Sequence, residues 1–473
     1  MTHALKKIPL FQNVKEKRFN SLATSNIRLT VQNSDCRIHN ISDSGAAFWC
    51  KQDFHEQLET VFSLSLSEES PLELKGRILW KRKEDQGFLY GFHFNSQYLP
   101  EGFLEAIDKL DFVKEKLNQD LKSYDLVSND FKILTFEIKN FLGSIKQTLD
   151  QLESEIRVCS EGTRNSYKEV LKAKLEPDFV STLKKFSKRL DLIFSQVTEK
   201  ELRKNYIHFF RNEVGAYYTQ NPFIGRALRK PLGYAGDFEM MNQIYRDSYE
   251  GNSFFEILMH RYGINESSSL SVKFRKKYLS DKILSLSKEK SQFTFGSIAS
   301  GPAHEILQFL DQVPVNESEK YRIVLVDQDV EALLNSKRSI YDKIISRNLK
   351  CKTFFLPISV KHILESTEET QLFKEFKFDL LYSAGLYDYL TQPVAQILTY
   401  HLSLSLKQEG TMIIGNFHPN NPTKTISELV ADWRLIHRSE DEMIQLTQLL
   451  NFKEYRLHKD DQEIDLFLEV TMK

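Results

Sequence analysis

The chain has 473 residues, which corresponds to about three domains at roughly 150 residues per domain. Hydrophobic residues make up 41% and charged residues 27%, proportions that fit a folded globular protein and exclude a wholly disordered one. The 64 lysines and arginines balance the 65 aspartates and glutamates, so the sequence lacks the basic excess of a DNA- or RNA-binding protein.

Cysteine spacing and hydropathy bear on compartment. The four cysteines are far apart and form no CxxC pair or His/Cys cluster, so we expect a reducing environment and no metal site. Lysines near the N-terminus are not followed by the apolar run of a signal peptide, and no segment reaches the length of a membrane span. We therefore expect a cytoplasmic protein.

Residues 1–100 have the pattern of a β module. Short alternating or β-branched runs at 27–31, 76–80 and 88–94 are separated by polar turn clusters. Residues 101–215 contain few helix breakers, and their apolar residues recur at steps of three or four, which predicts helices. We interpret this segment as a connector and as a surface for a homodimer.

Residues 216–473 are predicted to form an α/β domain that begins with a cap. From about Val272 onward, apolar runs alternate with helical patterns, which predicts βαβ units and a mostly parallel sheet. The five runs lie at 293–297, 321–326, 353–356, 378–383 and 411–416. Ligands of such sheets bind outside the carboxyl ends of the strands.

A small-residue turn follows the first of these runs. Its side chains are short from Ser297 to Ala303, so a ligand can approach the backbone, and the helix after it offers free N–H groups. The second run ends in Asp327, 26 positions after Gly301, where a carboxylate can accept ribose hydroxyls. The turn is neither GxGxxG nor GxxxxGK[ST], which disfavours NAD and ATP; an ordinary βα turn is the alternative to a nucleotide site.

The phrases "SIASGPAHE" and "VLVDQD" resemble the first two motifs of class I S-adenosylmethionine-dependent methyltransferases. The resemblance implies S-adenosylmethionine as cofactor and Asp327 as its ribose ligand. It departs where Ala299 and Ala303 replace glycines and where Ser297 and Ser359 replace acids. The implied cofactor-binding residues are Ser297, Ala299, Gly301, Pro302, Glu305, Asp327, Ser359 and Ser383.

A narrower resemblance covers residues 200–473. The phrases "KPLGYAGDFEMMNQIY", "FDLLYSAGLYDYL", "GNFHPNNPT" and "DWRLIHR" are similar to the methyltransferases of 3-hydroxypalmitic acid methyl ester biosynthesis. This implies methylation of the carboxylate of a 3-hydroxy fatty acid or a related small acid. The plentiful phenylalanines and tyrosines could line an acyl pocket.

Candidate catalytic residues follow from position. Tyr234 and Asp237 lie in a glycine-interrupted loop that could fold over the cofactor or could be a plain turn. Tyr387 and Asp388 follow the fourth strand, where the methyl acceptor is expected, and His418 follows the fifth. Arg438 is placed on a helical stretch with Trp433 and Arg434, where it could bind a carboxylate or form a surface salt bridge.

The N-terminal module resembles a PilZ domain over residues 14–100, which implies a small β-barrel that often binds cyclic di-GMP. Asn40, Ser42 and Gly45 reproduce its [DN]xSxxG motif. Its RxxxR arm is degraded, because Lys17 and Ser21 stand at the arginine positions and only Arg18 lies between them. A barrel kept for packing or partner contact is the alternative.

Three functions remain open from the sequence. The first is a methyltransferase for a small acid, with the PilZ-like module as regulator. The second is a non-catalytic receptor for a cyclic di-GMP-type ligand, in which the altered glycine turn no longer binds its cofactor. The third is a methyltransferase that acts on protein.

Overall fold

The computed structural model describes residues 19–20, 27–42, 44–65, 72–84, 86–95, 103–156, 159–365 and 373–473. The chain divides into two compact units, residues 1–122 and 123–473. Helix α1 (Phe103–Leu126) contains the division. Among the described helices, none combines the length and the apolar character needed to cross a membrane.

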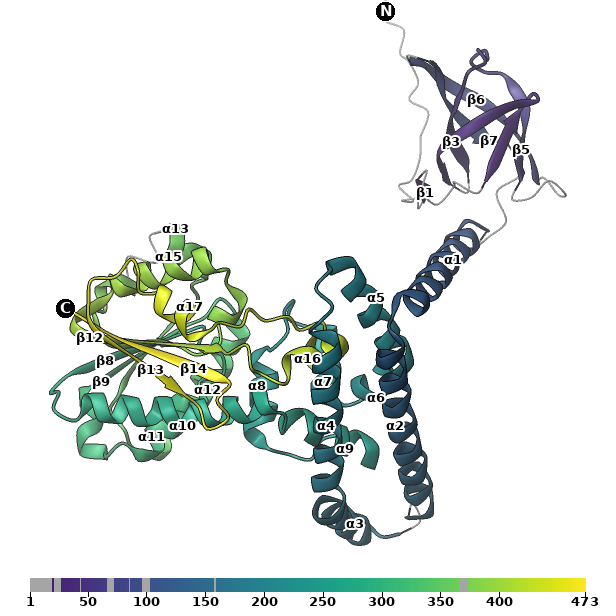
Figure 1. Ribbon diagram of the computed structural model, residues 1–473. Helices are drawn as coiled ribbons and strands as arrows, with labels where there is room; N and C mark the ends of the chain where they lie inside the picture. The colour runs from purple at the N-terminus through teal and green to yellow at the C-terminus, as the bar shows by residue number, and fades with distance from the viewer. Residues whose placement is uncertain are drawn as a thin grey trace, which may run out of the picture. The chain divides into compact units, whose positions relative to one another are not determined.

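The first unit contains a closed antiparallel barrel. Its six strands pair in the order β3-β2-β5-β6-β7-β4, and β4 pairs again with β3, so the sheet has no free edge at this seam (Figure 1). Alternate side chains point inward, and in the core Phe48 stacks on Tyr90 and meets Phe62 edge to face. The predicted strands are confirmed. The bounds are β1 (Phe19–Asn20), which pairs with β3, β2 (Arg28–Val31), β3 (Ser34–Ser42), β4 (Gly45–Cys50), β5 (Glu59–Ser65), β6 (Leu72–Glu84) and β7 (Gly87–Phe94).

The second unit begins with helices that share one apolar core. Apolar residues that recur at steps of three or four, such as Leu134, Ile138, Leu183 and Leu190, are buried in it. Residues from the segment 206–264 and from α16 (Lys424–Ala431) complete this core. The helices are α2 (Asn129–Ile156), α3 (Glu161–Lys174), α4 (Glu176–Phe194), α5 (Lys200–Phe210), the π-helix η1 (Arg211–Gly215), α6 (Ala216–Thr219), α7 (Pro222–Arg229), α8 (Phe238–Arg246) and α9 (Phe254–Ile264).

A mixed seven-stranded sheet follows, in the order β10-β9-β8-β11-β12-β14-β13. The strands β10, β9, β8, β11 and β12 are parallel, and β14 runs antiparallel to β12. The predicted α/β fold class is therefore confirmed. The strands are β8 (Phe293–Ile298), β9 (Tyr321–Val326), β10 (Lys352–Leu356), β11 (Phe378–Ser383), β12 (Leu406–Phe417), β13 (Phe452–Lys459) and β14 (Asp465–Met472).

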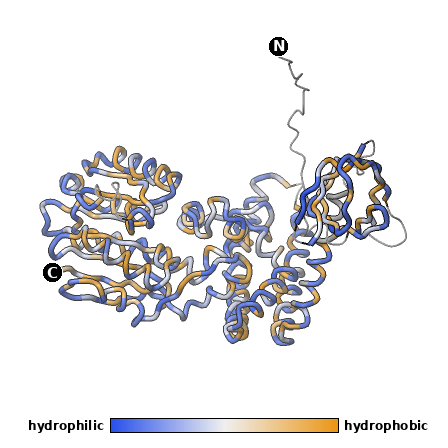
Figure 2. The backbone as a smooth tube through the Cα atoms, turned by 90° about the horizontal axis from the view of Figure 1, so that it is seen from above, coloured by the Kyte–Doolittle hydropathy of each residue, from blue (hydrophilic) through white to orange (hydrophobic). Residues whose placement is uncertain are grey.

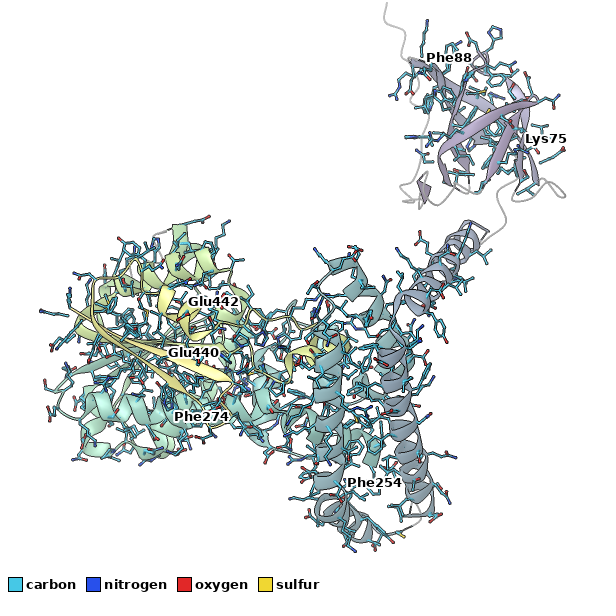
Figure 3. All side chains as sticks on the ribbon, in the orientation of Figure 1. Lys75, Phe88, Phe254, Phe274, Glu440 and Glu442 are labelled. Carbon is cyan, nitrogen blue, oxygen red and sulfur yellow. The ribbon has the colours of Figure 1, made fainter. Side chains whose placement is uncertain are left out.

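Helices cover both faces of this sheet. One face packs against α10 (Ser267–Ser287), α11 (His304–Gln312) and α12 (Val330–Ser346), and the other against α13 (Val360–Glu365), α15 (Gln392–Ser403) and α17 (Glu440–Gln445). Hydrophobic segments run through the layers (Figure 2). The short 3-10 helices η2 (Val315–Lys320) and η3 (Tyr387–Tyr389) complete the fold. Phe274 of α10 contacts His458 and Phe467 of the last two strands (Figure 3).

One local prediction is wrong. Residues 432–439, which carry Trp433, Arg434 and Arg438, were expected on a helix, but α16 ends at Ala431 and the segment is irregular. Asp432 takes a left-handed conformation (φ +49°), which ends the helix. Arg438 is also not at the surface, because only 1% of it is exposed.

Candidate functional site

A cavity of about 370 Å³ lies at the carboxyl ends of β8, β9 and β11. Parallel strands present their carboxyl ends at one edge of a sheet, where the chain crosses to the helices and leaves an opening. Seven of the eight predicted cofactor-binding residues line the cavity. They are Ser297, Ala299, Gly301, Pro302, Glu305, Asp327 and Ser359. The eighth, Ser383, is buried beneath it and donates a hydrogen bond to the Ile298 carbonyl oxygen.

The turn after β8 has an unusual backbone. Ala299, Gly301 and Ala303 all have φ between +52° and +53°, so every second residue is left-handed. Such a conformation is unfavourable for alanine, by roughly 1–2 kcal/mol per residue. A Cβ at Gly301 would meet no atom within 4 Å, so this position presents bare backbone to open space. The turn therefore lets a ligand approach the backbone closely.

Asp327 is fixed at the tip of β9 by backbone donors. Its Oδ2 accepts a hydrogen bond from the Gly301 N–H at 2.8 Å and its Oδ1 one from the Asp329 N–H at 2.9 Å. Burial raises the pKa of this carboxyl, and the N–H donors oppose that rise. Each oxygen keeps a further lone pair for a ligand hydroxyl.

Glu305 and Ser297 form the floor of the cavity. The Glu305 Oε1 accepts hydrogen bonds from the Tyr382 hydroxyl at 2.9 Å and from the Ser297 hydroxyl at 3.4 Å. Burial raises the pKa of the Glu305 carboxyl. No cation of the described residues lies within ion-pair distance of it. Sequence reasoning noted that a serine replaces the usual acid at 297; the fold brings Glu305 beside it.

The segment between α7 and the end of α8 lines the other side of the cavity. Tyr234 donates a hydrogen bond from its hydroxyl to the Asp329 Oδ2 at 2.9 Å, which joins the loop to the tip of β9. Asp237, by contrast, caps α8 and forms an ion pair with Arg226 at 2.8 Å, and it does not line the cavity.

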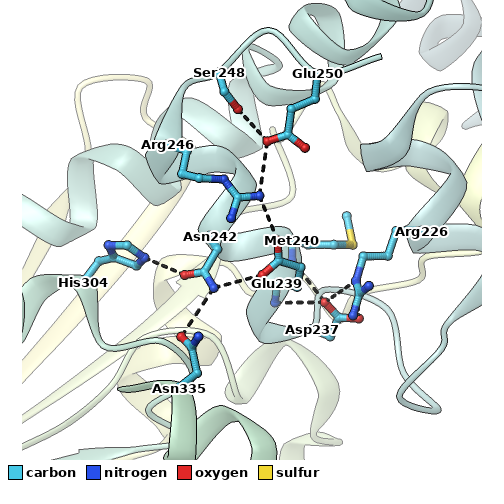
Figure 4. Close-up of polar contacts among 10 residues, drawn as sticks. All are labelled: Arg226, Asp237, Glu239, Met240, Asn242, Arg246, Ser248, Glu250, His304 and Asn335. Atoms are coloured by element: carbon cyan, nitrogen blue, oxygen red, sulfur yellow. Dashed lines mark hydrogen bonds and ion pairs between the residues drawn. The ribbon is translucent and has the colours of Figure 1, made fainter. Parts of the chain in front are cut away.

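Polar contacts connect α8 to the start of α11 (Figure 4). The His304 ring nitrogen Nε2 lies 2.8 Å from the Asn242 side-chain oxygen, and the ring lies beside Tyr245. Burial lowers the pKa of His304 to about 4, so the ring is neutral at neutral pH. Asn242 in turn donates to Glu239 and to Asn335 of α12. Helix α11, which follows the turn after β8, is thereby held against α8.

A second, more apolar cavity adjoins the first. Helices α7, α8, α10 and α16 contribute hydrophobic side chains to its wall, among them Ile224, Ile244, Val272, Ile426 and Val430. Five residues line both cavities: Gly236, Met241, Arg275, Gly385 and Tyr389. The Tyr389 hydroxyl accepts from the Trp433 indole N–H and donates to the Ala235 carbonyl, so it fixes this junction.

The predicted acceptor-side residues separate into two groups. Asp388 lines the second cavity. Tyr387, His418 and Arg438 line neither cavity. The Tyr387 hydroxyl contacts Thr399, and the His418 ring lies 3.2 Å from Glu440.

The predicted dinucleotide-binding residues belong to the N-terminal barrel. It contains Asn40, Ser42 and Gly45, and the Ser42 hydroxyl donates a hydrogen bond to the Gly45 carbonyl oxygen. Lys17 and Arg18 lie outside the described residues.

Residues 12–105 match the PilZ domain family, so the N-terminal barrel is a PilZ domain. No curated protein matches the sequence. Solved structures with similar folds include a possible exported protein from Bordetella parapertussis (12% identity, TM-score 0.42, 67% of this chain and 99% of that one). Another is the Synechocystis magnesium protoporphyrin IX methyltransferase with bound S-adenosylhomocysteine (9% identity, TM-score 0.35, 53% of this chain and 98% of that one). A third is the Bradyrhizobium japonicum N-methyltransferase NodS with the same ligand (14% identity, TM-score 0.31, 44% of this chain and 89% of that one). Likenesses with TM-scores this low assign neither the fold nor a reaction.

Proposed function

We propose that the chain is an S-adenosylmethionine-dependent methyltransferase that esterifies the carboxylate of a 3-hydroxy fatty acid or a related small acid. The observation that carries the proposal is the junction of the two cavities. One cavity has the turn and the strand-terminal acid of a nucleoside site, and the other has an apolar wall. A donor and a hydrocarbon acceptor can therefore meet at the five shared residues.

The residues of the first cavity fit the cofactor by their chemistry. Asp327 would accept the two ribose hydroxyls, since its carboxylate is held at the tip of β9. The buried Glu305 carboxyl would accept the ammonium of the methionyl part, because no cation of the described residues lies within ion-pair distance of it. The bare backbone at Gly301 leaves room beside them. When bound, the sulfonium supplies an electrophilic methyl group.

An acid acceptor needs little chemical assistance from the protein. A carboxylate is ionised near neutral pH, so its oxygen can form the new C–O bond to the methyl carbon while the S–CH₃ bond breaks and its electron pair returns to sulfur. No proton moves in this displacement. The protein must align the two reactants and exclude water, and the apolar wall of the second cavity serves both purposes. The 3-hydroxy fatty acid itself is proposed from the sequence resemblance.

The test is identification of the product. The full chain is incubated with methyl-labelled S-adenosylmethionine and 3-hydroxypalmitic acid, and the organic extract is examined for a labelled methyl ester. The Asp327→Ala variant is the matched control, since it removes the ribose acceptor. Label in protein instead of lipid would support the protein methyltransferase. No binding of S-adenosylmethionine at high micromolar concentration would support the non-catalytic receptor.

We further propose that the PilZ domain regulates this activity. Asn40, Ser42 and Gly45 retain one arm of the cyclic di-GMP motif, while the arginine arm is incomplete. Calorimetry of the full chain with cyclic di-GMP, and with Ser42→Ala as control, tests binding. Methylation rates with and without the dinucleotide test regulation. Unchanged rates together with undetectable binding would leave the barrel a packing or partner-binding module.

A further inference from the structure

Arg275 lies on α10 at the junction of the two cavities, and its sequence context did not single it out. It is one of the five residues that line both cavities. It is also the only cationic residue among those five. The helix carries it to the carboxyl end of β11, where the Nη1 group donates to the Ala384 carbonyl oxygen at 2.6 Å.

The guanidinium has no anionic partner within the described parts of the chain. None of their carboxylates lies within 4.0 Å of it; Met241 provides a thioether sulfur 3.6 Å from Nη2. Other arginines of the same unit are paired, Arg226 with Asp237 and Arg261 with Glu176. A guanidinium has five N–H donors in a planar fork, and one carbonyl oxygen occupies only a part of them.

The groups around Arg275 leave its positive charge uncompensated at close range. Asp388, Asp465 and Glu305 interact with it electrostatically from beyond ion-pair distance, and burial raises the pKa of all three carboxyls. The Tyr245 hydroxyl interacts with the guanidinium as a neutral hydrogen-bond partner, because burial raises its pKa to about 12. Gly385 adds no side chain: a Cβ there would lie 3.4 Å from Nη1. The space in front of the fork is thereby kept open.

We propose that Arg275 is the carboxylate-binding residue of this site. A partly buried cation without a carboxylate partner is stabilised by an anionic ligand, and the guanidinium fork matches a carboxylate with two parallel hydrogen bonds. Two ligands could supply that group: the acid acceptor in the second cavity and the methionyl part of the cofactor in the first. If the acid acceptor supplies the carboxylate, the inference rests on the proposed function. If the cofactor supplies it, the inference rests only on cofactor binding.

The test uses the full chain with Arg275→Met and Arg275→Lys, and Lys277→Met as control. Lys277 is exposed on the same helix and pairs with Asp281, so its variant removes a cation without touching either cavity. Calorimetry measures the affinities for four ligands, which form two pairs. S-adenosylhomocysteine is compared with 5′-methylthioadenosine, which lacks the amino-acid end, and 3-hydroxydecanoic acid is compared with its methyl ester.

Arg275→Met should weaken one carboxylate ligand by about tenfold to hundredfold, as expected for loss of a charged hydrogen bond, and leave its neutral partner unchanged. Loss confined to the fatty acid assigns Arg275 to the acceptor, and loss confined to S-adenosylhomocysteine assigns it to the cofactor. Arg275→Lys should lose several-fold on the same ligand, and it decides the matter if the methionine variant does not fold. Equal affinities of both variants and wild type for both acids would overturn the proposal.

This outcome is separable from the proposed function. If wild type forms the labelled ester while Arg275→Met binds both acids normally, the methyltransferase function is supported and the proposed role of Arg275 is wrong. If no ester forms but Arg275→Met loses affinity for S-adenosylhomocysteine alone, the carboxylate-binding role is supported and the proposed acid acceptor is wrong.

Discussion

The Asp388 side chain should make the stability of the larger unit depend on pH in a defined window. It lies in η3, directly after β11, lines the second cavity and is 3% exposed. Its Oδ1 accepts a hydrogen bond from the Phe417 N–H at 2.8 Å. Burial raises the pKa of this carboxyl from 3.8 to about 6, and the Phe417 N–H and the charge of Arg275 limit the rise.

The sign follows from linkage. The folded state holds the proton more tightly than the unfolded chain, so the stabilisation is complete below about pH 4 and is lost as the pH rises through about 6. The interval from 3.8 to about 6 corresponds to about 3 kcal/mol at 1.36 kcal/mol per pH unit. Asp388→Asn keeps an oxygen for the Phe417 N–H but does not titrate. The free energy of unfolding of wild type, minus that of the variant, should therefore fall by about 3 kcal/mol across this window and stay constant above it.

The assay is urea unfolding followed by circular dichroism at closely spaced pH values between 4 and 8. Asp441→Asn is the control, because Asp441 is exposed at the start of α17. Its difference from wild type should not show the 3 kcal/mol step. If the difference in the free energy of unfolding between wild type and Asp388→Asn is constant between pH 4 and 6, burial does not raise the pKa of Asp388 as argued.

Four further predictions concern the cofactor cavity and the domains. Asp327→Ala should weaken S-adenosylhomocysteine binding by about tenfold to hundredfold in calorimetry, since charged hydrogen bonds contribute about 1.5–3 kcal/mol; unchanged affinity would show that the ribose site is elsewhere. Tyr234→Phe loses the hydrogen bond to Asp329 and should speed the dissociation of S-adenosylhomocysteine several-fold in stopped-flow experiments. An unaltered dissociation rate would show that this hydrogen bond does not help to retain the ligand. Gly236→Ala forces alanine to φ +74° and places a Cβ 2.5 Å from the Trp433 ring, so the melting temperature should fall, and an unaltered one would contradict the strain. The larger unit expressed alone should bind S-adenosylhomocysteine as the full chain does, and insoluble protein would mean that it needs the barrel.

The sheet was largely predictable because parallel strands are buried on both faces. Such strands read as short continuous apolar runs, as β9 does from Tyr321 to Val326. The strands β13 and β14 did not appear among the predictions. β13 lies at the sheet edge and most of its residues are exposed, Lys453, Glu454 and Arg456 among them. An edge strand with charged side chains has no apolar run to identify it.

The first cavity was predictable for a related reason. Its lining comes from the turn after β8 and the tip of β9, two local patterns whose meeting is dictated by the parallel sheet. The second cavity was not, because α7, α10 and α16 meet there only through tertiary packing. Arg275 has Lys273, Lys276 and Lys277 as close neighbours in sequence, so the pattern alone indicates a solvated helix face.

A comparison of the buried Arg438 with the partly buried Arg275 shows what distinguishes a structural cation from a binding one. Arg438 donates to the carbonyl oxygens of Tyr387 and Leu390 and to side-chain oxygens of Asn416 and Gln392, so protein atoms satisfy its fork and hold the chain after β12 in place. Arg275 donates to one carbonyl oxygen, has only the Met241 sulfur and the neutral Tyr245 hydroxyl as further partners among the described residues, and lines two cavities. The sequence directed attention to Arg438 as a carboxylate ligand, but the number of its acceptors leaves few donors for a ligand. Because acceptors come from distant segments, only the folded chain reveals which arginine remains free to bind.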